Sequence, residues 1–250
     1  MFKSSIALFL AASATVGHAD PKPEPIKTIV LVHGAFADSS SWDKVAPILE
    51  AKGYRLIAVN LPLDSFANDV AATKRALEVA PGPVLLVGHS YGGFVITEAG
   101  TNEKVKGLVY VAAFAPDNGE SVNDIYKGRP QPEWIKGAIF DTTGFAWLKR
   151  ETVATTFAQD LSQTEITNLT RKQGPTALAL FEGRITNAAW HTKPAWFVRP
   201  ENDRMVAPDI QADLAKRAGM KVTNIKSSHV VMLSHPNEVA TVILAAAANK

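Results

Sequence analysis

The sequence contains no cysteine, which excludes disulfide bonds, thiolate metal sites and a cysteine nucleophile. It also has no large excess of one charge: 26 Lys and Arg stand against 24 Asp and Glu, and the formal net charge is +2. No block of basic residues stands out, so the charge pattern does not indicate nucleic-acid binding. We find no internal repeat, and the biased stretch at residues 21–25 is a short proline-rich segment.

The apolar stretch at residues 6–16 is too short to cross a bilayer as a helix. It follows Lys3 and leads to the small residues Gly17 and Ala19. This layout is typical of a secretory signal peptide, here residues 1–19. We therefore expect an exported protein, periplasmic or secreted, with no stable membrane insertion after cleavage.

What the sequence does contain is an alternation of short apolar strands with amphipathic helices. Hydrophobic residues make up 46% of the 250 residues, which is enough for a sizeable core. Strands that are apolar throughout indicate a parallel sheet covered by helices on both faces. We predict an α/β fold over residues 20–250, built on a mainly parallel six-stranded sheet. The expected strands span 28–32, 55–59, 83–87, 105–112, 194–198 and 222–225, and the expected helices span 41–52, 65–79, 94–100, 208–218 and 236–247.

Residues 117–193 interrupt this alternation between the fourth and fifth expected strands. The segment is aromatic and has mainly helical spacing. Parallel sheets bind ligands at the carboxyl ends of their strands, and an insertion at this point can cover those ends. We predict that residues 117–193 form an inserted helical cap, which closes a pocket for a small apolar or aromatic molecule.

The stretch GHSYGG, residues 88–93, follows the third expected strand and begins a helix. Its pattern, G-x-S-x-G, mounts a nucleophilic serine on a sharp turn between strand and helix. The serine is held in a strained conformation, and Cβ atoms at Gly88 or Gly92 would clash with the neighbouring strand and helix. We predict that Ser90 is the nucleophile and that the Tyr91 N–H faces the negative charge that develops during attack.

A serine hydroxyl needs a general base at neutral pH. His229 lies in the loop between the last expected strand and the closing helix, which brings it to the same edge of the sheet as Ser90. We predict His229 as the base. His235 is the competing histidine, but its place directly before Pro236 is typical of a helix start.

The base needs a carboxylate that orients it and stabilises its charged form. Asp203 lies in the loop after the fifth expected strand, and we predict that it fills this role. Glu201, two residues earlier, is the near alternative. Asp117, after the fourth expected strand, is a more distant one.

The developing oxyanion needs a second donor besides the Tyr91 N–H. The first expected strand ends in the stretch HGAF, residues 33–36. Gly34 allows a close approach of the backbone. We predict the Ala35 N–H as the second donor, with the Phe36 N–H as its alternative.

Four stretches together, LVHGAFADSSSW, LVGHSYGG, PENDRMVAP and SSHVVMLSHP, resemble the α/β-hydrolase superfamily. They are similar in particular to the small-cap esterases of the salicylate-methyl-ester esterase, pyrethroid hydrolase and hydroxynitrile lyase group. The order Ser90, Asp203, His229 is the chain order of that fold. The resemblance implies hydrolysis of small carboxylic esters through an acyl-enzyme on Ser90, without cofactor or metal. The lyase branch has threonine and lysine where this chain has Gly34 and Val230, which disfavours lyase activity.

Other activities share the same constellation of residues. Cofactor-free haloperoxidase-like members carry the triad, and a lactonase or thioesterase would use the same nucleophile. A second class of function is a hydrolase-fold receptor that binds a ligand without turnover. An eroded triad would favour a receptor, whereas this sequence retains all three candidates.

The signal-peptide prediction is tested by the start of the exported chain. Cleavage after Ala19 leaves Asp20 as the first residue of secreted or periplasmic material. N-terminal sequencing of that material should read Asp20. Exported protein that still begins at Met1 would contradict the cleavage.

Overall fold

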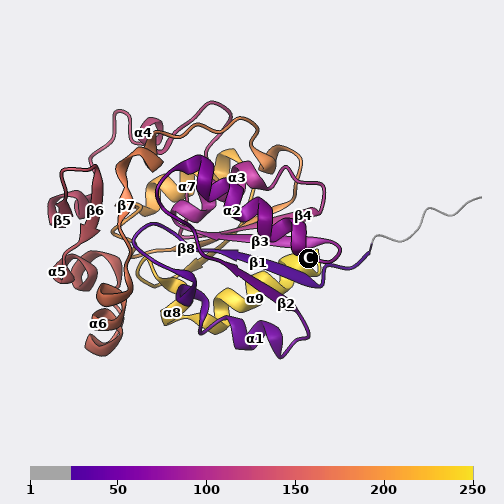
Figure 1. Ribbon diagram of the computed structural model, residues 1–250. Coiled ribbons are helices and arrows are strands. Elements are labelled where there is room, and N and C mark those ends of the chain that lie inside the picture. The colour runs from indigo at the N-terminus through magenta and orange to yellow at the C-terminus, as the bar shows by residue number, and fades with distance from the viewer. Residues whose placement is uncertain (1–23, 250) are drawn as a thin grey trace, which may run out of the picture.

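A six-stranded sheet runs through the centre of the computed structural model, which describes residues 24–249 (Figure 1). The predicted signal peptide, residues 1–19, lies outside the described residues. All neighbouring strands pair in parallel, in the order β2-β1-β3-β4-β8-β9, which confirms the predicted α/β class. The strands are β1 (Thr28–Val32), β2 (Arg55–Val59), β3 (Val84–His89), β4 (Val105–Val111), β8 (Ala195–Pro200) and β9 (Lys221–Ile225).

Helices cover both faces of the sheet, as predicted (Figure 1). On one face lie α2 (Phe66–Val79), α3 (Tyr91–Ala99) and α7 (Pro208–Arg217). On the other lie α1 (Ala46–Glu50), α8 (Val231–Ser234) and α9 (Pro236–Ala247). Strands β1 and β3 are buried along their whole length, which is why their sequences are apolar without alternation. Among the described residues, no helix has both the length and the apolar character needed to cross a bilayer.

The helix predicted over residues 41–52 is broken into two short pieces. A 3-10 helix, η1 (Ser39–Trp42), comes first, and α1 begins only at Ala46. Pro47 occupies the first turn of α1, where its missing N–H is tolerated. A proline also disfavours the helical conformation of the residue before it, so a helix continuous through this position is opposed.

The insertion between β4 and β8 lies at one end of the molecule, away from the described C-terminal residues (Figure 1). It contains the expected helices, but also a three-stranded antiparallel sheet in the order β5-β6-β7 that the sequence did not reveal. Its hairpin turns at Asp141, whose carboxylate accepts the N–H groups of Thr143 and Phe145, and at Gly144, which has φ +88°. The elements of this cap are α4 (Val122–Ile125), η2 (Glu133–Gly137), β5 (Ala138–Phe140), β6 (Phe145–Leu148), α5 (Arg150–Thr152), η3 (Val153–Phe157), α6 (Gln163–Lys172), β7 (Thr176–Ala177), η4 (Leu178–Glu182) and η5 (Ala189–His191).

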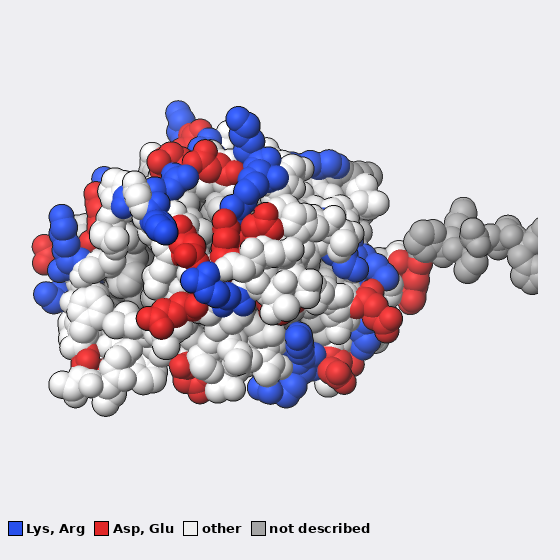
Figure 2. Space-filling view, turned by 90° about the horizontal axis from the view of Figure 1, so that it is seen from above, with Lys and Arg blue, Asp and Glu red and all other residues white. Residues whose placement is uncertain are grey.

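Charged side chains of both signs are interleaved over the face seen from above (Figure 2). Ion pairs on the described surface include Arg129 with Asp213 and Arg217 with Glu120, both at 2.7 Å. That face therefore carries no broad patch of a single charge, in keeping with the balanced composition.

A buried carboxylate joins α2 to the start of α3. Asp69 is fully buried and accepts hydrogen bonds from the Leu63 N–H and the Tyr91 hydroxyl, both at 2.9 Å. Burial raises the pKa of Asp69 to about 6, although the two hydrogen bonds oppose the shift. The bond from the Tyr91 hydroxyl to Asp69 attaches the first residue of α3 to α2.

The raised pKa of Asp69 makes stability depend on pH. The folded chain binds the proton more tightly than the unfolded chain, so the free energy of unfolding falls as pH rises from near 3.8 through about 6. Relative to Asp69→Asn, the wild type should lose on the order of 2–3 kcal/mol across this range. Urea denaturation at stepped pH measures the difference, with the exposed Asp43→Asn as control. Parallel pH profiles for wild type and Asp69→Asn would contradict this assignment.

Candidate active site

Ser90 lies on a strained turn between β3 and α3. Its φ of 54° and ψ of −122° fall in a region that non-glycine residues rarely adopt. The flanking glycines are required by close backbone contacts. A Cβ at Gly88 would lie 2.5 Å from the Gly92 carbonyl oxygen, and one at Gly92 would lie 2.5 Å from that of His33.

The structure brings Asp203 and His229 together. The Nδ1 of His229 lies 2.7 Å from Oδ2 of Asp203, and both side chains are fully buried. The other donors to this carboxylate are the N–H groups of Met205 and Val206 and the side-chain amide of Gln211, at 2.8 to 3.0 Å. Because Asp203 accepts at this nitrogen, its carboxylate holds the ring proton of neutral His229 on Nδ1.

The other ring nitrogen of His229, Nε2, is buried and has no hydrogen-bond partner among the described residues. With the proton held on Nδ1, Nε2 of the neutral ring is an acceptor. The ring also contacts Phe157 of the cap at 5.4 Å between centroids. Phe157 and Ser90 line the same cavity, so the His229 ring packs against a side chain of the wall that includes Ser90. Within the described chain, Ser90 itself makes no hydrogen bond to His229.

The competing residues have other places. Glu201 is exposed at the surface, and Asp117 pairs with His191 at 2.7 Å. His235 stands at the start of α9, where its Nδ1 contacts the Ser234 hydroxyl at 3.0 Å. Neither alternative carboxylate is therefore the one bonded to His229.

The Ala35 N–H is a free backbone donor in the turn after β1, which lies close to Ser90. The Phe36 N–H donates to the Thr176 hydroxyl at 3.0 Å and is thus occupied. Among the hydrogen bonds of residues 24–249, none uses the N–H of Ala35 or of Tyr91. A Cβ at position 34 would lie 2.7 Å from that of Ser90, so Gly34 allows the turn to approach the serine closely.

His33 and His89 are buried histidines that form hydrogen bonds to the backbone of the site. His33 accepts the Leu61 N–H on Nε2 and donates from Nδ1 to the Gly34 carbonyl. His89 donates from Nε2 to the His229 carbonyl at 3.0 Å, and the two rings lie 4.7 Å apart. Burial lowers the pKa of both, and the nearby His229 lowers that of His89 further, so both rings are neutral at pH 7.

Three supporting residues were missed from the sequence. Gln211 lies on α7, eight residues beyond Asp203, and its side-chain amide donates to the Asp203 carboxylate. Its amide, so soon after the predicted carboxylate, was the one signal in the sequence for this contact. Phe157 and Thr176 belong to the cap, and nothing in the local sequence indicates that they reach His229 and Phe36.

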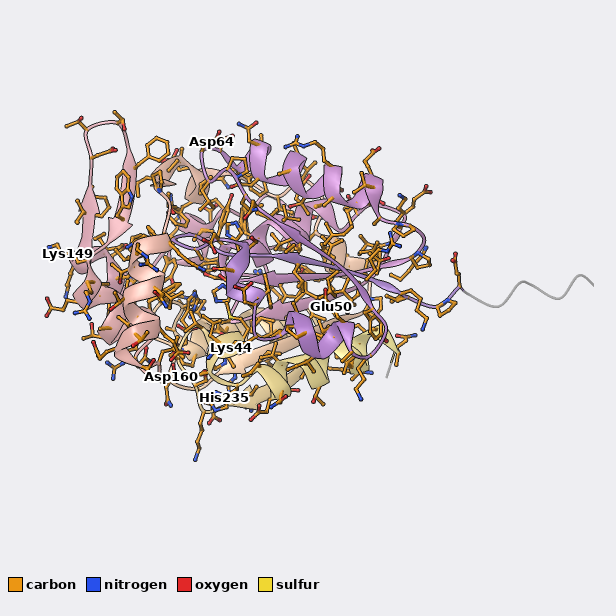
Figure 3. All side chains as sticks on the ribbon, turned by 60° about the horizontal axis from the view of Figure 1, so that its bottom comes forward. Lys44, Glu50, Asp64, Lys149, Asp160 and His235 are labelled. Atoms are coloured by element: carbon orange, nitrogen blue, oxygen red, sulfur yellow. The ribbon has the colours of Figure 1, made fainter. Side chains whose placement is uncertain are left out.

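The cap is bonded to the loops that carry Asp203 and His229. The Asp160 carboxylate accepts the Ser228 N–H at 2.8 Å, and the Gln159 amide donates to the Asn202 carbonyl at 2.7 Å. Figure 3 shows Asp160 near Lys44 and His235, where the cap meets the body of the fold. Lys44 adds an ion pair to Glu165 of α6.

A cavity of about 340 Å³ lies between the cap and the sheet, and Ser90 is part of its wall. Much of the remaining wall is aromatic, and Glu182 is the one charged residue among those that line it in the described part of the chain. Across residues 24–249, no group of three or more His, Asp or Glu side chains is placed to hold a metal ion. The aromatic lining consists of Phe36, Tyr91, Phe114, Tyr126, Trp134, Phe140, Phe157 and Phe181.

Curated relatives are hydrolases and esterases. A protein named probable hydrolase R7 from a Phoma species is 30% identical over 241 residues, which cover 86% of this chain and 96% of the relative. A carbendazim hydrolyzing esterase from a Nocardioides species is 32% identical over 120 residues, covering 42% and 49%. Salicylic acid-binding protein 2 from Nicotiana tabacum is 33% identical over 128 residues, covering 44% and 49%.

Solved structures share the fold. Polyneuridine aldehyde esterase superposes with a TM-score of 0.77 at 22% identity, covering 88% of this chain and 98% of that one. A pyrethroid hydrolase from Sphingobium faniae superposes with a TM-score of 0.78 at 20% identity, covering 89% and 97%. The family model described as alpha/beta hydrolase matches residues 29–242. The sheet order, the strand–serine–helix turn and this match agree with the resemblance expected from the motifs: the chain belongs to the alpha/beta hydrolase family.

Proposed function

We propose that the chain is a serine hydrolase that cleaves small carboxylic esters through an acyl-enzyme on Ser90, with His229 as general base and Asp203 as its carboxylate. The observation that carries the proposal is the buried Asp203–His229 hydrogen bond of 2.7 Å, which leaves Nε2 of His229 unpaired in a ring that packs against Phe157, a residue of the cavity wall that Ser90 shares. Relatives named methylesterase and pyrethroid hydrolase support ester cleavage as the reaction.

In this mechanism, the Ser90 oxygen attacks the ester carbonyl carbon while Nε2 of His229 accepts the hydroxyl proton. Asp203 stabilises the imidazolium that forms. The N–H groups of Ala35 and Tyr91 donate to the oxyanion of the tetrahedral intermediate. The C–O bond then breaks, and the departing alkoxide takes the proton from His229. Water, deprotonated by His229, attacks the acyl carbon; the bond to the Ser90 oxygen breaks, the acid is released, and His229 returns the proton to that oxygen.

The cavity supports a neutral, apolar or aromatic ester as the substrate. Its volume is at the small end of the range for ligand sites, and its wall is aromatic. No Lys or Arg is among the lining residues that the structure describes, so a free carboxylate on an ester substrate would lack a cationic partner. Because the leader has the layout of a signal peptide, we propose that this hydrolysis takes place outside the cytoplasm.

Loss of the serine hydroxyl should abolish turnover. For Ser90→Ala we expect p-nitrophenyl acetate hydrolysis to fall by about three to four orders of magnitude. Ser39→Ala removes a serine that is not part of the cavity wall and should keep the wild-type rate. A serine-reactive phosphonate should label the wild type at Ser90. Ligand binding without labelling or turnover would instead identify a receptor.

Substitution of the carboxylate should separate Asp203 from Glu201. For Asp203→Asn we expect kcat to fall roughly 10⁴-fold, because the amide no longer stabilises the correct tautomer of His229. Glu201→Gln is the matched control and should remain near the wild-type rate, since Glu201 is exposed. The reverse pattern in steady-state kinetics would transfer the role to Glu201.

A further inference from the structure

The turn that carries the Ala35 N–H is held on its inner side by His33. Since Nε2 of His33 accepts the Leu61 N–H, the ring proton must be on Nδ1, from which it is donated to the Gly34 carbonyl at 2.8 Å. That carbonyl and the Ala35 N–H belong to one planar, trans peptide unit and point in opposite directions. The His33 bond therefore restrains this peptide unit at its carbonyl end, and the rest of the turn is held from the other side.

The outer side of the same turn is held by the cap. Phe36 has φ 58°, an unfavourable conformation for a residue with a side chain. Its N–H donates to the hydroxyl of Thr176, a fully buried residue of β7, at 3.0 Å. Its ring packs edge-on against Trp134 of the cap, with centroids 5.2 Å apart. Two cap residues thus hold Phe36 in this conformation.

Strand β7 also connects to the other backbone donor. The Ala177 N–H donates to the Leu63 carbonyl at 2.9 Å. Leu63 in turn donates its N–H to Asp69, which accepts the Tyr91 hydroxyl. The two residues of β7 therefore lie at the end of both hydrogen-bonded paths, one to Phe36 beside Ala35 and one to Tyr91.

We propose that Thr176 is a positioning residue for the reaction: by accepting the Phe36 N–H, its hydroxyl holds the turn so that the Ala35 N–H points at the oxyanion. The inference rests on the proposed esterase function. Without the Thr176 oxygen, the Phe36 N–H is buried and unpaired, and the turn gains by rotating to find another acceptor. Rotation of that peptide unit would misdirect the neighbouring Ala35 N–H. The cap then contributes to transition-state stabilisation as well as to enclosing the substrate.

The test compares Thr176→Val, which keeps the shape but removes the acceptor, with Thr176→Ser, which keeps the hydroxyl. For Thr176→Val we expect kcat for p-nitrophenyl acetate to fall about 10- to 100-fold with KM within threefold, as part of what loss of a whole oxyanion donor causes. Binding of a trifluoromethyl ketone, which forms a tetrahedral adduct with the serine, should weaken by a similar factor. Thr176→Ser should recover kcat to within about threefold of the wild type.

The matched control is Thr152→Val. Thr152 is another buried cap threonine, but its hydroxyl donates to the Gly137 carbonyl within the cap. Its loss should leave kcat within about threefold of the wild type. If the wild type is active and Thr176→Val has the same kcat, the inference is overturned and the proposed function stands. If the wild type is inactive, the proposed function is overturned and the inference falls with it.

A measurement on the unmodified protein covers the case in which Thr176→Val does not fold. Amide hydrogen exchange of the wild type should show the Phe36 N–H protected to the level of the central strands, because its acceptor is buried. Exchange as fast as that of an exposed loop would show that the bond to Thr176 is not maintained in solution, and would overturn the inference.

Discussion

The close approach of the Ser90 turn to the end of β1 is the contact on which the site depends. A Cβ at Gly92 would lie within 2.6 Å of two carbonyl oxygens of the chain at Val32 and His33. Because these contacts are between backbone atoms, no rotation of a side chain can relieve a substitution there. The approach brings the turn that carries the Ala35 N–H close to Ser90 and its neighbour Tyr91, although Ala35 and Tyr91 are 56 positions apart in sequence.

A second constraint concerns the charges around His229. Its ring lies against that of a second histidine, His89, which would place a positive charge beside His229 if it were protonated. Burial keeps His89 neutral, because it holds the pKa of His89 well below its usual value. His89 also donates to the carbonyl of His229. The neutral neighbour therefore supports the backbone of His229 without adding a charge beside its ring.

The sheet was predictable from the sequence because each buried strand is a short, uninterrupted apolar run, as in Thr28–Val32. The place of Asp203 after β8 was predictable for the same reason. The choice between Asp203 and Glu201, two residues apart, needed the structure, in which Asp203 is buried and Glu201 is exposed. The cap sheet was not predictable, since its strands have two to four residues and aromatic side chains suit helix and strand alike. The pairing of Phe36 with Thr176 joins residues 140 apart and has no local signal.

The cap is hydrogen-bonded to the body of the fold near Asp160 and again along β7, while other cap residues line the cavity. This division separates two kinds of inherited change. Substitutions along η4 can alter which ester is accepted and leave intact the hydrogen bonds from the cap to the loops of Asp203, His229 and Phe36. Substitutions at Asp160 or Thr176 act on those hydrogen bonds whatever the ester. We therefore expect related chains to change their ester specificity through η4 and to keep Asp160 and Thr176.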